Sequence, residues 1–325
     1  MATASLKAIQ VKFNQALHHH NLLPAHAKIL IAVSGGQDSL CLWHLISQAQ
    51  AKWQWQIAIA HCDHRWRPDS ADCAAHIQNL AERAQVPYFV RVANLPLTSE
   101  ATAREWRYRM LIEIAQTQDY NLITTGHTRS DRAETLLYNL MRGSGSDGLQ
   151  ALGWRRALTP ELFLVRPLLN LSRSDTATLC NAANLPIWID STNQQLQYRR
   201  NRIRAQLLPY IATHFNPQIE IALSQTAELL HQDTLYLEQQ AQALWQPHQP
   251  PRLNRQTLQA QPIALQRRAI RQFLRHHLPQ ISLNYDQIER FKQLLTAPNR
   301  SRSSLLAPNT WAAVNHPWIE LVNNL

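Results

Sequence analysis

The sequence has little cysteine, little glycine and no long apolar run. Its four cysteines (Cys41, Cys62, Cys73 and Cys180) form no C-x-x-C pair, so neither a zinc ribbon nor a cluster site is indicated. Four scattered cysteines suit a reducing compartment. No stretch approaches the length of an apolar membrane span, and residues 1–13 lack the apolar run of a signal peptide. We therefore expect a cytoplasmic protein with no membrane attachment.

Acidic residues are scarce relative to basic ones. The chain has 22 Asp and Glu against 32 Lys and Arg, which gives a formal net charge of +10 and an isoelectric point of about 9.8. This balance favours a polyanionic partner, although a basic but otherwise ordinary enzyme would share it. With 325 residues, the chain is long enough for about two domains.

All seven glycines lie between Gly35 and Gly153, and the first two follow an apolar run. Residues 29–33 are all apolar, as is typical of a central parallel strand. Apolar residues then recur at helical spacing from Ser39 onward. A strand, a glycine turn and a helix N-terminus form an anion site, because free N–H groups and the helix dipole both favour phosphate. No Gly-Lys-Ser/Thr follows, so this is not a Walker A loop.

The loop reads Ser34-Gly35-Gly36-Gln37-Asp38-Ser39. An aspartate inside a phosphate loop would repel ATP unless a divalent cation lay between them. The order Ser-Gly-Gly-x-Asp-Ser is similar to the pyrophosphate loop of the N-type ATP pyrophosphatases, which implies ATP as the first substrate, and Asp38 indicates Mg²⁺. The alternative is an ordinary turn between a strand and a helix, since many α/β proteins have glycine there.

Strand and helix patterns alternate over the first half of the chain. Apolar strand patterns at 55–61, 88–92, 122–125 and 162–169 are separated by helical patterns. This order predicts an α/β fold with a doubly wound, mostly parallel sheet. Two of the strands end in polar clusters, one around His61, Asp63 and His64 and one at Gly126 and His127. Parallel sheets bind ligands at that edge. For the cluster around His61, which lacks further ligands nearby, we favour nucleotide or substrate contact, or ordinary turn chemistry, over a metal site.

Two clusters place basic residues on predicted helices. Arg104, Arg107 and Tyr108 share one face of a helix over 99–117; this face is either a substrate surface or a solvated charged face. Residues 199–204 contain four arginines, which either contact phosphate or form a solvated run.

A pair of carboxylates follows the strand at 122–125. Asp131 and Glu134 lie one turn apart near the N-terminus of a helix that Thr128 or Ser130 can cap. Carboxylates in this position either stabilise the helix end or bind Mg²⁺ or an ammonium group.

The composition changes after residue 215. Residues 217–245 read as one long helix without Lys or Arg, whereas residues 252–302 contain ten Lys and Arg against two acidic residues. Residues 303–322 hold short alternating apolar pieces that predict a small hairpin-like cap. We predict a catalytic α/β domain over residues 1–215 and a mainly helical, basic domain over residues 216–325, whose charge favours a polyanionic partner.

Several spaced blocks, in the same order, resemble the tRNA(Ile)-lysidine synthases, a family of N-type ATP pyrophosphatases in the PP-loop superfamily. The blocks are the loop 34–39, Ala60–Arg65, Glu100 with Ala103–Tyr108, Gly126–Thr135, Arg142–Gly145, Arg166–Leu169, Asp190 with Asn193, and Arg200–Arg204. They cover most of the chain. Ser130 departs from the pattern, because the family commonly has the first aspartate of a pair there.

The resemblance implies a two-step reaction on the wobble cytidine in the CAU anticodon of an isoleucine tRNA. ATP adenylates the C2 oxygen of this cytidine and pyrophosphate leaves. The amine of free L-lysine then displaces AMP, which gives lysidine. The implied cofactors are ATP and Mg²⁺.

The expected site combines these blocks. Catalytic roles are expected for Asp38, Asp131 and Glu134, with Asp38 also holding the metal. ATP is expected to contact Ser34, Gly35, Gly36, Gln37, Asp38, Ser39, His61, Gly126 and His127. Lysine or tRNA is expected to contact Arg104, Arg107, Arg142, Arg200, Arg202 and Arg204. Asp131 and Glu134 are the candidates for the lysine ammonium group, and Arg202 or Arg204 for its carboxylate or the leaving phosphate.

Other functions fit parts of the same pattern. A PP-loop tRNA thiolase would use the same loop but should carry paired cysteines, which this sequence lacks. A tRNA-binding module with a vestigial ATP site would bind tRNA without forming AMP. The sequence leaves the oligomeric state open, a homodimer included.

Overall fold

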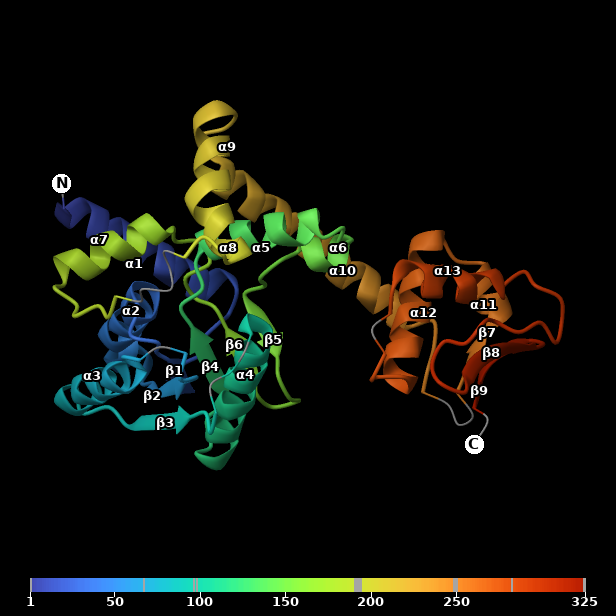
Figure 1. Cartoon of the computed structure of the whole chain (residues 1–325), viewed down its shortest axis with the longest axis horizontal. Coiled ribbons are helices and arrows are strands. Elements are labelled where there is room, and N and C mark those ends of the chain that lie inside the picture. The colour runs from blue at the N-terminus through green and yellow to red at the C-terminus, as the bar shows by residue number, and fades with distance from the viewer. Residues whose placement is uncertain are drawn as a thin grey trace. The chain divides into compact units, whose positions relative to one another are not determined.

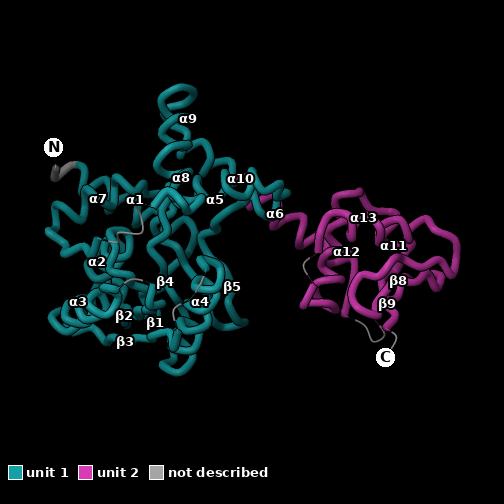
Figure 2. Tube along the Cα trace, in the orientation of Figure 1, with its two compact units in different colours: residues 1–228 teal, residues 229–325 magenta. Residues whose placement is uncertain are grey.

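The chain forms two compact units, Met1–Glu228 and Leu229–Leu325 (Figure 2). A computed structural model describes residues 2–66, 68–95, 97, 99–189, 195–247, 251–281 and 283–323. Asp190 and Asn193, which form one of the family-like blocks, lie outside the described residues. None of the described helices is both long and apolar enough to cross a membrane.

Unit 1 is built on a six-stranded sheet in the order β3-β2-β1-β4-β6-β5 (Figure 1). Its strands are β1 (Lys28–Ala32), β2 (Gln56–Asp63), β3 (Tyr88–Val92), β4 (Leu122–Thr125), β5 (Arg155–Ala157) and β6 (Phe163–Val165). Neighbouring strands are parallel except β5 and β6, which are antiparallel. The predicted doubly wound, mostly parallel sheet is confirmed.

Helices cover both faces of this sheet. The helices of unit 1 that precede its last helix are α1 (Ala2–His19), α2 (Gln37–Trp53), α3 (Ser70–Arg83), α4 (Glu100–Thr117), α5 (Arg129–Met141), α6 (Ser146–Leu149), α7 (Arg173–Ala182), α8 (Arg199–Arg202), the π-helix η2 (Ile203–Leu207) and α9 (Leu208–His214). Ile29 and Ile31 of β1 pack in a core with α1, α2, α3 and α7, whereas Leu30 packs with α4. Successive side chains of a strand point to opposite faces, so the apolar residues 29–32 of β1 require a helix layer on each side.

The chain changes its winding direction at β1. It continues from β1 to β2 and β3 on one side, and then returns to β4 on the other side. Ligands of doubly wound sheets bind beyond the carboxyl ends of the strands at such a switch point. β2 runs to Asp63, so the strand extends two residues beyond the predicted end at His61, and Asp63 belongs to it.

The antiparallel edge of the sheet differs most from expectation. The sequence predicts one strand over 162–169, but β6 contains only Phe163–Val165, and Pro167 soon follows, where the missing N–H cannot join a ladder. β5 was not predicted, because its residues Arg155–Ala157 are all exposed and carry no apolar pattern.

The last helix of unit 1, α10 (Ile219–Gln242), continues into unit 2. Ile219 and Leu223 pack on a small core in unit 1 that contains Ala133, Leu137, Ile203 and Leu208. Glu228 accepts hydrogen bonds from Arg132 at 2.8 Å and from the Trp154 indole N–H at 2.9 Å. These contacts hold the first turns of α10 on unit 1, so this unit extends beyond the predicted boundary at residue 215.

Unit 2 has a core of its own. It contains α11 (Arg255–Gln259), α12 (Ile263–His277) and α13 (Tyr285–Gln293), and a sheet of β7 (Arg252–Asn254), β8 (Thr310–Asn315) and β9 (Trp318–Asn323) in the antiparallel order β7-β9-β8. Phe273 and Phe291 are fully buried in this core. The hairpin expected within 303–322 is present as β8 and β9, whereas the short β7 that completes the sheet was not predicted.

We expect Glu228→Ala to destabilise unit 1 by roughly 3 kcal/mol, because it leaves the guanidinium of Arg132, 1% exposed, without its carboxylate partner. Urea unfolding followed by tryptophan fluorescence measures this loss. Asp233→Ala is the matched control, since Asp233 is an exposed acid on the same helix. Equal stability of the two variants would contradict the prediction.

Candidate active site

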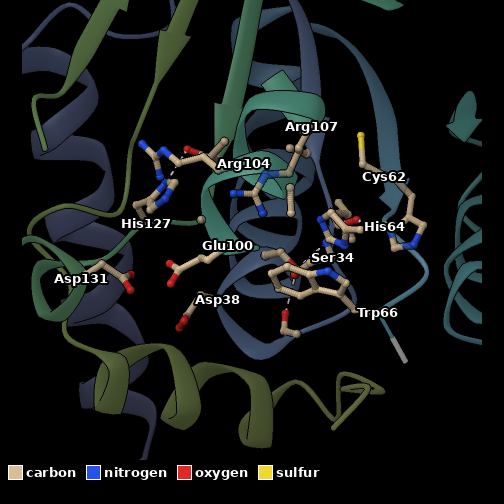
Figure 3. A pocket seen from close by; sticks show the side chains of 18 of the residues that line it. Ser34, Asp38, Cys62, His64, Trp66, Glu100, Arg104, Arg107, His127 and Asp131 are labelled. Carbon is tan, nitrogen blue, oxygen red and sulfur yellow. Dashed lines mark hydrogen bonds between the residues drawn. The ribbon is translucent and has the colours of Figure 1, made fainter. Parts of the chain in front are cut away.

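A cavity of about 430 Å³ lies at the switch point of the sheet (Figure 3). The predicted site residues that line it are Ser34, Gly36, Gln37, Asp38, Ser39, His61, Arg104, Arg107, Gly126, His127, Asp131, Arg200 and Arg204. They come from the loop after β1, from β2, from the segment after β4, and from the five helices α2, α4, α5, α8 and η2. The volume falls in the range of small-molecule sites, so the fold gathers most of the predicted site around one ligand-sized space.

The phosphate loop is closed on itself by two serines. The hydroxyl of Ser39 donates to the carbonyl of Gly36 at 2.8 Å and accepts from the backbone N–H of Ser34 at 3.2 Å. Gly36 is the N-cap of α2 and has no side chain that could accept a hydrogen bond from the first N–H groups of the helix. The first N–H groups of α2 therefore stay available to an anion.

Two glycines are needed for close approaches around this loop. Gly35 has a φ of +82°, and a Cβ there would lie 3.0 Å from the sulfur of Cys73. A Cβ on Gly126 would lie 2.6 Å from the carbonyl oxygen of Asp38. Gly35 does not line the cavity, so its contribution is the shape of the loop, whereas Gly126 lets the segment after β4 touch the loop directly.

Asp38 is held by α7, a helix that the sequence does not connect to the loop. The Thr176 hydroxyl donates to Asp38 Oδ1 at 2.5 Å, and Arg173 Nη2 lies 3.7 Å from Oδ2. Burial raises the pKa of Asp38, and Arg173 and the Thr176 hydrogen bond oppose the rise. The capping box Ser172-x-x-Asp175 marks the start of α7 in the sequence, but nothing in the pattern shows that this helix faces Asp38.

Asp131 fills both roles that its position suggests. Thr128 is the N-cap of α5, and Asp131 Oδ2 accepts from its backbone N–H at 2.8 Å. Oδ1 lies 3.5 Å from Nη2 of Arg204. Burial opposes ionisation, but His127, the Thr128 N–H and Arg204 together hold the pKa of Asp131 below its ordinary value. The carboxylate therefore caps α5 and also presents negative charge to the cavity.

Glu134 lies behind Arg204. Its two oxygens accept from Arg204 Nε at 2.6 Å and Nη2 at 2.8 Å, and its side chain is 2% exposed. Burial raises the pKa of Glu134, and Arg204 opposes the rise. Glu134 is not among the residues that line the cavity, so a ligand ammonium could reach it only if Arg204 moved.

A second group of arginines gathers around Tyr108. The guanidinium carbons of Arg104, Arg107 and Arg156 lie 5.1, 6.0 and 5.0 Å from the centre of its ring. Burial of Tyr108 opposes ionisation of its phenol, yet Arg104 and the buried Arg166 are the main groups that lower its pKa. Arg156 and Arg166, from β5 and the residue after β6, were not predicted to join this group, because the sequence does not show that these segments approach α4.

The two predicted histidines are oriented by neighbouring oxygens. His61 Nδ1 lies 2.8 Å from the carbonyl of Val33, and His127 Nδ1 lies 2.8 Å from the hydroxyl of Thr125. Burial, with Arg166 and other nearby arginines, lowers the pKa of His127 despite the opposing charge of Asp131. Its imidazole is therefore neutral at pH 7.

Two predicted arginines lie elsewhere. Arg142 is the exposed C-cap of α5, with its guanidinium 5.4 Å from the ring of Tyr138. Arg202 is exposed on α8, while Arg200 and Arg204, on the same helical segment, line the cavity. Of the four arginines over 199–204, Arg200 and Arg204 thus belong to the site, and the other two belong to the solvated surface.

Magnesium fits this site as a metal shared with a phosphate ligand. Among the described residues, no group of three or more His, Cys, Asp or Glu side chains could hold a metal by itself. Mg²⁺ commonly takes one or two carboxylates and completes its coordination with phosphates and water. Asp38, on the phosphate loop, offers that carboxylate, and the metal would help to neutralise charge on the phosphates.

The comparisons with known proteins agree with this geometry. Residues 5–211 match the PP-loop domain family. The chain is 49% identical to a tRNA(Ile)-lysidine synthase from Nostoc sp., with 97% of each chain covered. It is 51% identical to a tRNA(Ile)-lysidine synthase from Synechocystis sp., over 86% of this chain and 87% of the relative. This chain belongs to the tRNA(Ile)-lysidine synthase family.

A solved structure supports the fold of unit 1 as well. A U34-tRNA thiolase from Methanococcus maripaludis, solved with its [4Fe–4S] cluster, matches with a TM-score of 0.61 at 14% identity, over 71% of this chain and 80% of that chain. At this identity the likeness concerns the fold alone. Among the described residues that line the cavity here, Cys62 is the one cysteine.

Ser130 has a clear partner in this structure. Its hydroxyl donates to Glu220 Oε2 at 2.7 Å and accepts from the backbone N–H of Arg173 at 3.2 Å, so it joins α5, α7 and α10. An aspartate at this position would place a second carboxylate against Glu220.

We expect Ser130→Asp to lower the free energy of unfolding by roughly 2 kcal/mol through repulsion from Glu220. The second change Glu220→Gln should restore most of that loss, because it removes the like charge. Urea unfolding of the two single variants and the double variant measures the coupling. Additive losses would show that the two side chains do not interact.

Proposed function

We propose that this protein ligates lysine to C2 of the wobble cytidine in the CAU anticodon of isoleucine tRNA, at the expense of ATP. One observation carries the proposal. A single cavity combines an uncapped phosphate loop, the loop carboxylate Asp38, the ionised Asp131 and two groups of arginines. Relatives at 49% and 51% identity, each named tRNA(Ile)-lysidine synthase, support it.

In the first step, the C2 oxygen of the cytidine attacks the α-phosphorus of ATP, and pyrophosphate leaves. The N–H groups at the start of α2 and the loop serines bind the departing phosphates. Asp38 would hold Mg²⁺ against them, and its contacts with Arg173 and Thr176 keep the carboxylate in place. The cytosine must leave its stack to reach this cavity.

In the second step, the lysine amine attacks C2 of the adenylated cytosine, AMP leaves with the C2 oxygen, and the amine loses a proton. The amine must be neutral to attack. Arg104, Arg107 and Arg204 all line the cavity, and nearby cations lower the pKa of an amine. Asp131 is the carboxylate that can accept its proton or orient it, while Glu134 fixes Arg204 in position.

The rest of the chain fits a tRNA partner. In unit 2, residues 252–302 contain ten Lys and Arg against Asp286 and Glu289, and we propose that this surface binds tRNA phosphates. We propose that the reaction takes place in the cytoplasm, where ATP, lysine and tRNA are all present. A homodimer is compatible with this proposal but not required by it.

The direct test combines purified protein, Mg-ATP, labelled lysine and an unmodified CAU-anticodon isoleucine tRNA transcript. We expect label in acid-precipitable RNA, and its loss when the wobble cytidine is replaced. AMP without lysine label would instead favour another nucleophile, as in a thiolase-like enzyme. Binding of tRNA without AMP formation would identify a binding module with a vestigial ATP site.

We expect Asp38→Ala to abolish pyrophosphate release, because it removes the proposed metal carboxylate from the phosphate loop. The affinity for tRNA should remain nearly unchanged, because Asp38 is acidic and does not attract the phosphates of the tRNA. A coupled pyrophosphate assay and filter binding measure the two quantities. Glu82→Ala, an exposed change on α3, is the control. Normal pyrophosphate release by the Asp38 variant would refute the metal assignment.

A further inference from the structure

The helical segment formed by α8, η2 and α9 has two different faces. Arg200 and Arg204, on one side, line the cavity. Ile203 and Leu208 are buried against α5 in the small core of unit 1. This segment is therefore fixed in place beside the proposed reaction site, and its opposite side faces solvent.

The solvent side carries cations and aromatic rings in one line. Its exposed residues are Arg199, Arg202, Gln206, Tyr210 and His214, followed by Phe215 at the end of α9. We call these six residues the outer stripe. The first five recur every three or four residues, which places them on one side of a helix, and Phe215 is the C-cap that directly follows His214. Figure 1 shows α9 projecting from the rest of unit 1.

Three rings of the outer stripe form a cluster in solvent. The ring centres of Tyr210 and His214 are 4.5 Å apart, and those of Tyr210 and Phe215 are 6.1 Å apart. Tyr210 is 56% exposed and Phe215 is 75% exposed. Contiguous exposed apolar surface marks interaction sites, and exposed rings are suited to a partner that stacks on them.

The charge around the cluster indicates the chemistry of that partner. No Asp or Glu occurs in the sequence between Asp190 and Glu220, whereas residues 199–204 hold four arginines. Guanidinium groups bind phosphate, and exposed rings stack on unpaired bases. A second copy of this chain, with a net charge of +10, would bring like charge to the same surface.

We propose that the outer stripe binds the unpaired nucleotides next to the target cytidine, with phosphates on Arg199 and Arg202 and bases stacked on Tyr210 and Phe215. This inference rests on the proposed function, because that function places an anticodon loop at the cavity. At about 1.5 Å per residue, Tyr210 lies about 12 Å along the helix from Arg202. One strand can thus place a base in the cavity and its neighbours on the rings.

The experiment measures the affinity of the full-length protein for a fluorescent RNA hairpin with the anticodon stem and loop of the substrate. We expect Tyr210→Ala with Phe215→Ala to raise the Kd at least about fivefold, the loss of one stacked base. In the full reaction, this double variant should raise the KM for tRNA while kcat and the KM for lysine stay unchanged. Tyr210→Trp should retain the affinity, because it keeps a stacking surface.

Tyr236→Ala is the matched control. Tyr236 is 62% exposed, but it lies on α10 near Asp233 and Glu238, where the local charge is acidic. This variant should bind the hairpin like the unchanged protein. The substituted side chains are exposed, so thermal unfolding should be unaffected in all variants.

Three results would overturn the inference. The first is an unchanged Kd and KM for tRNA in the Tyr210 and Phe215 double variant. The second is an equal loss for Tyr236→Ala. The third is that the unchanged protein is a dimer, the double variant is a monomer, and the affinity for RNA is the same in both. The outer stripe would then be an interface between copies. If the Kd for RNA depends on the two rings but the protein makes no lysidine, the RNA-binding role of the outer stripe is supported and the proposed function is contradicted.

Discussion

The site depends on the contact between α7 and the phosphate loop. Asp38 lies at the N-terminus of α2, where burial opposes its charge, and Arg173 and Thr176 stabilise the carboxylate there. The side chain of Gln37 also donates to the carbonyl of Arg173 at 2.7 Å and to the hydroxyl of Thr176 at 2.7 Å. The loop is thus held in shape before any phosphate arrives, so ligand binding does not have to order it.

The same cavity separates its charges. Arg104 and Arg107, beside Tyr108, bring positive charge to one part of the cavity, while Asp38 and Asp131 bring carboxylates to another. Arg204 lies beside the second of these, 3.5 Å from Asp131, with both oxygens of Glu134 as its main partners. Such an arrangement can receive an anionic nucleotide, a cationic metal and an amino acid in different places at once.

The fold and the phosphate loop could be predicted from the sequence, because both rest on local patterns: an apolar strand, two glycines and a helix start. Contacts between distant segments could not. The approach of Arg173 to Asp38, of Arg156 to Tyr108 and of Glu220 to Ser130 joins residues far apart in sequence. For the same reason, the sequence did not show which residues within one segment line the cavity. Nothing local distinguishes Arg200, which lines the cavity, from Arg202, which is exposed.

The central claim is that this cavity adenylates the C2 oxygen of cytidine before lysine attacks. The most direct measurement uses tRNA whose wobble cytidine carries ¹⁸O at C2, followed by mass spectrometry of the AMP released. The account predicts that the heavy oxygen is transferred to the phosphate of AMP as lysine is joined to the tRNA. AMP without ¹⁸O, formed in step with lysine-modified tRNA, would contradict it, because the oxygen of the base would then not have been the adenylated atom.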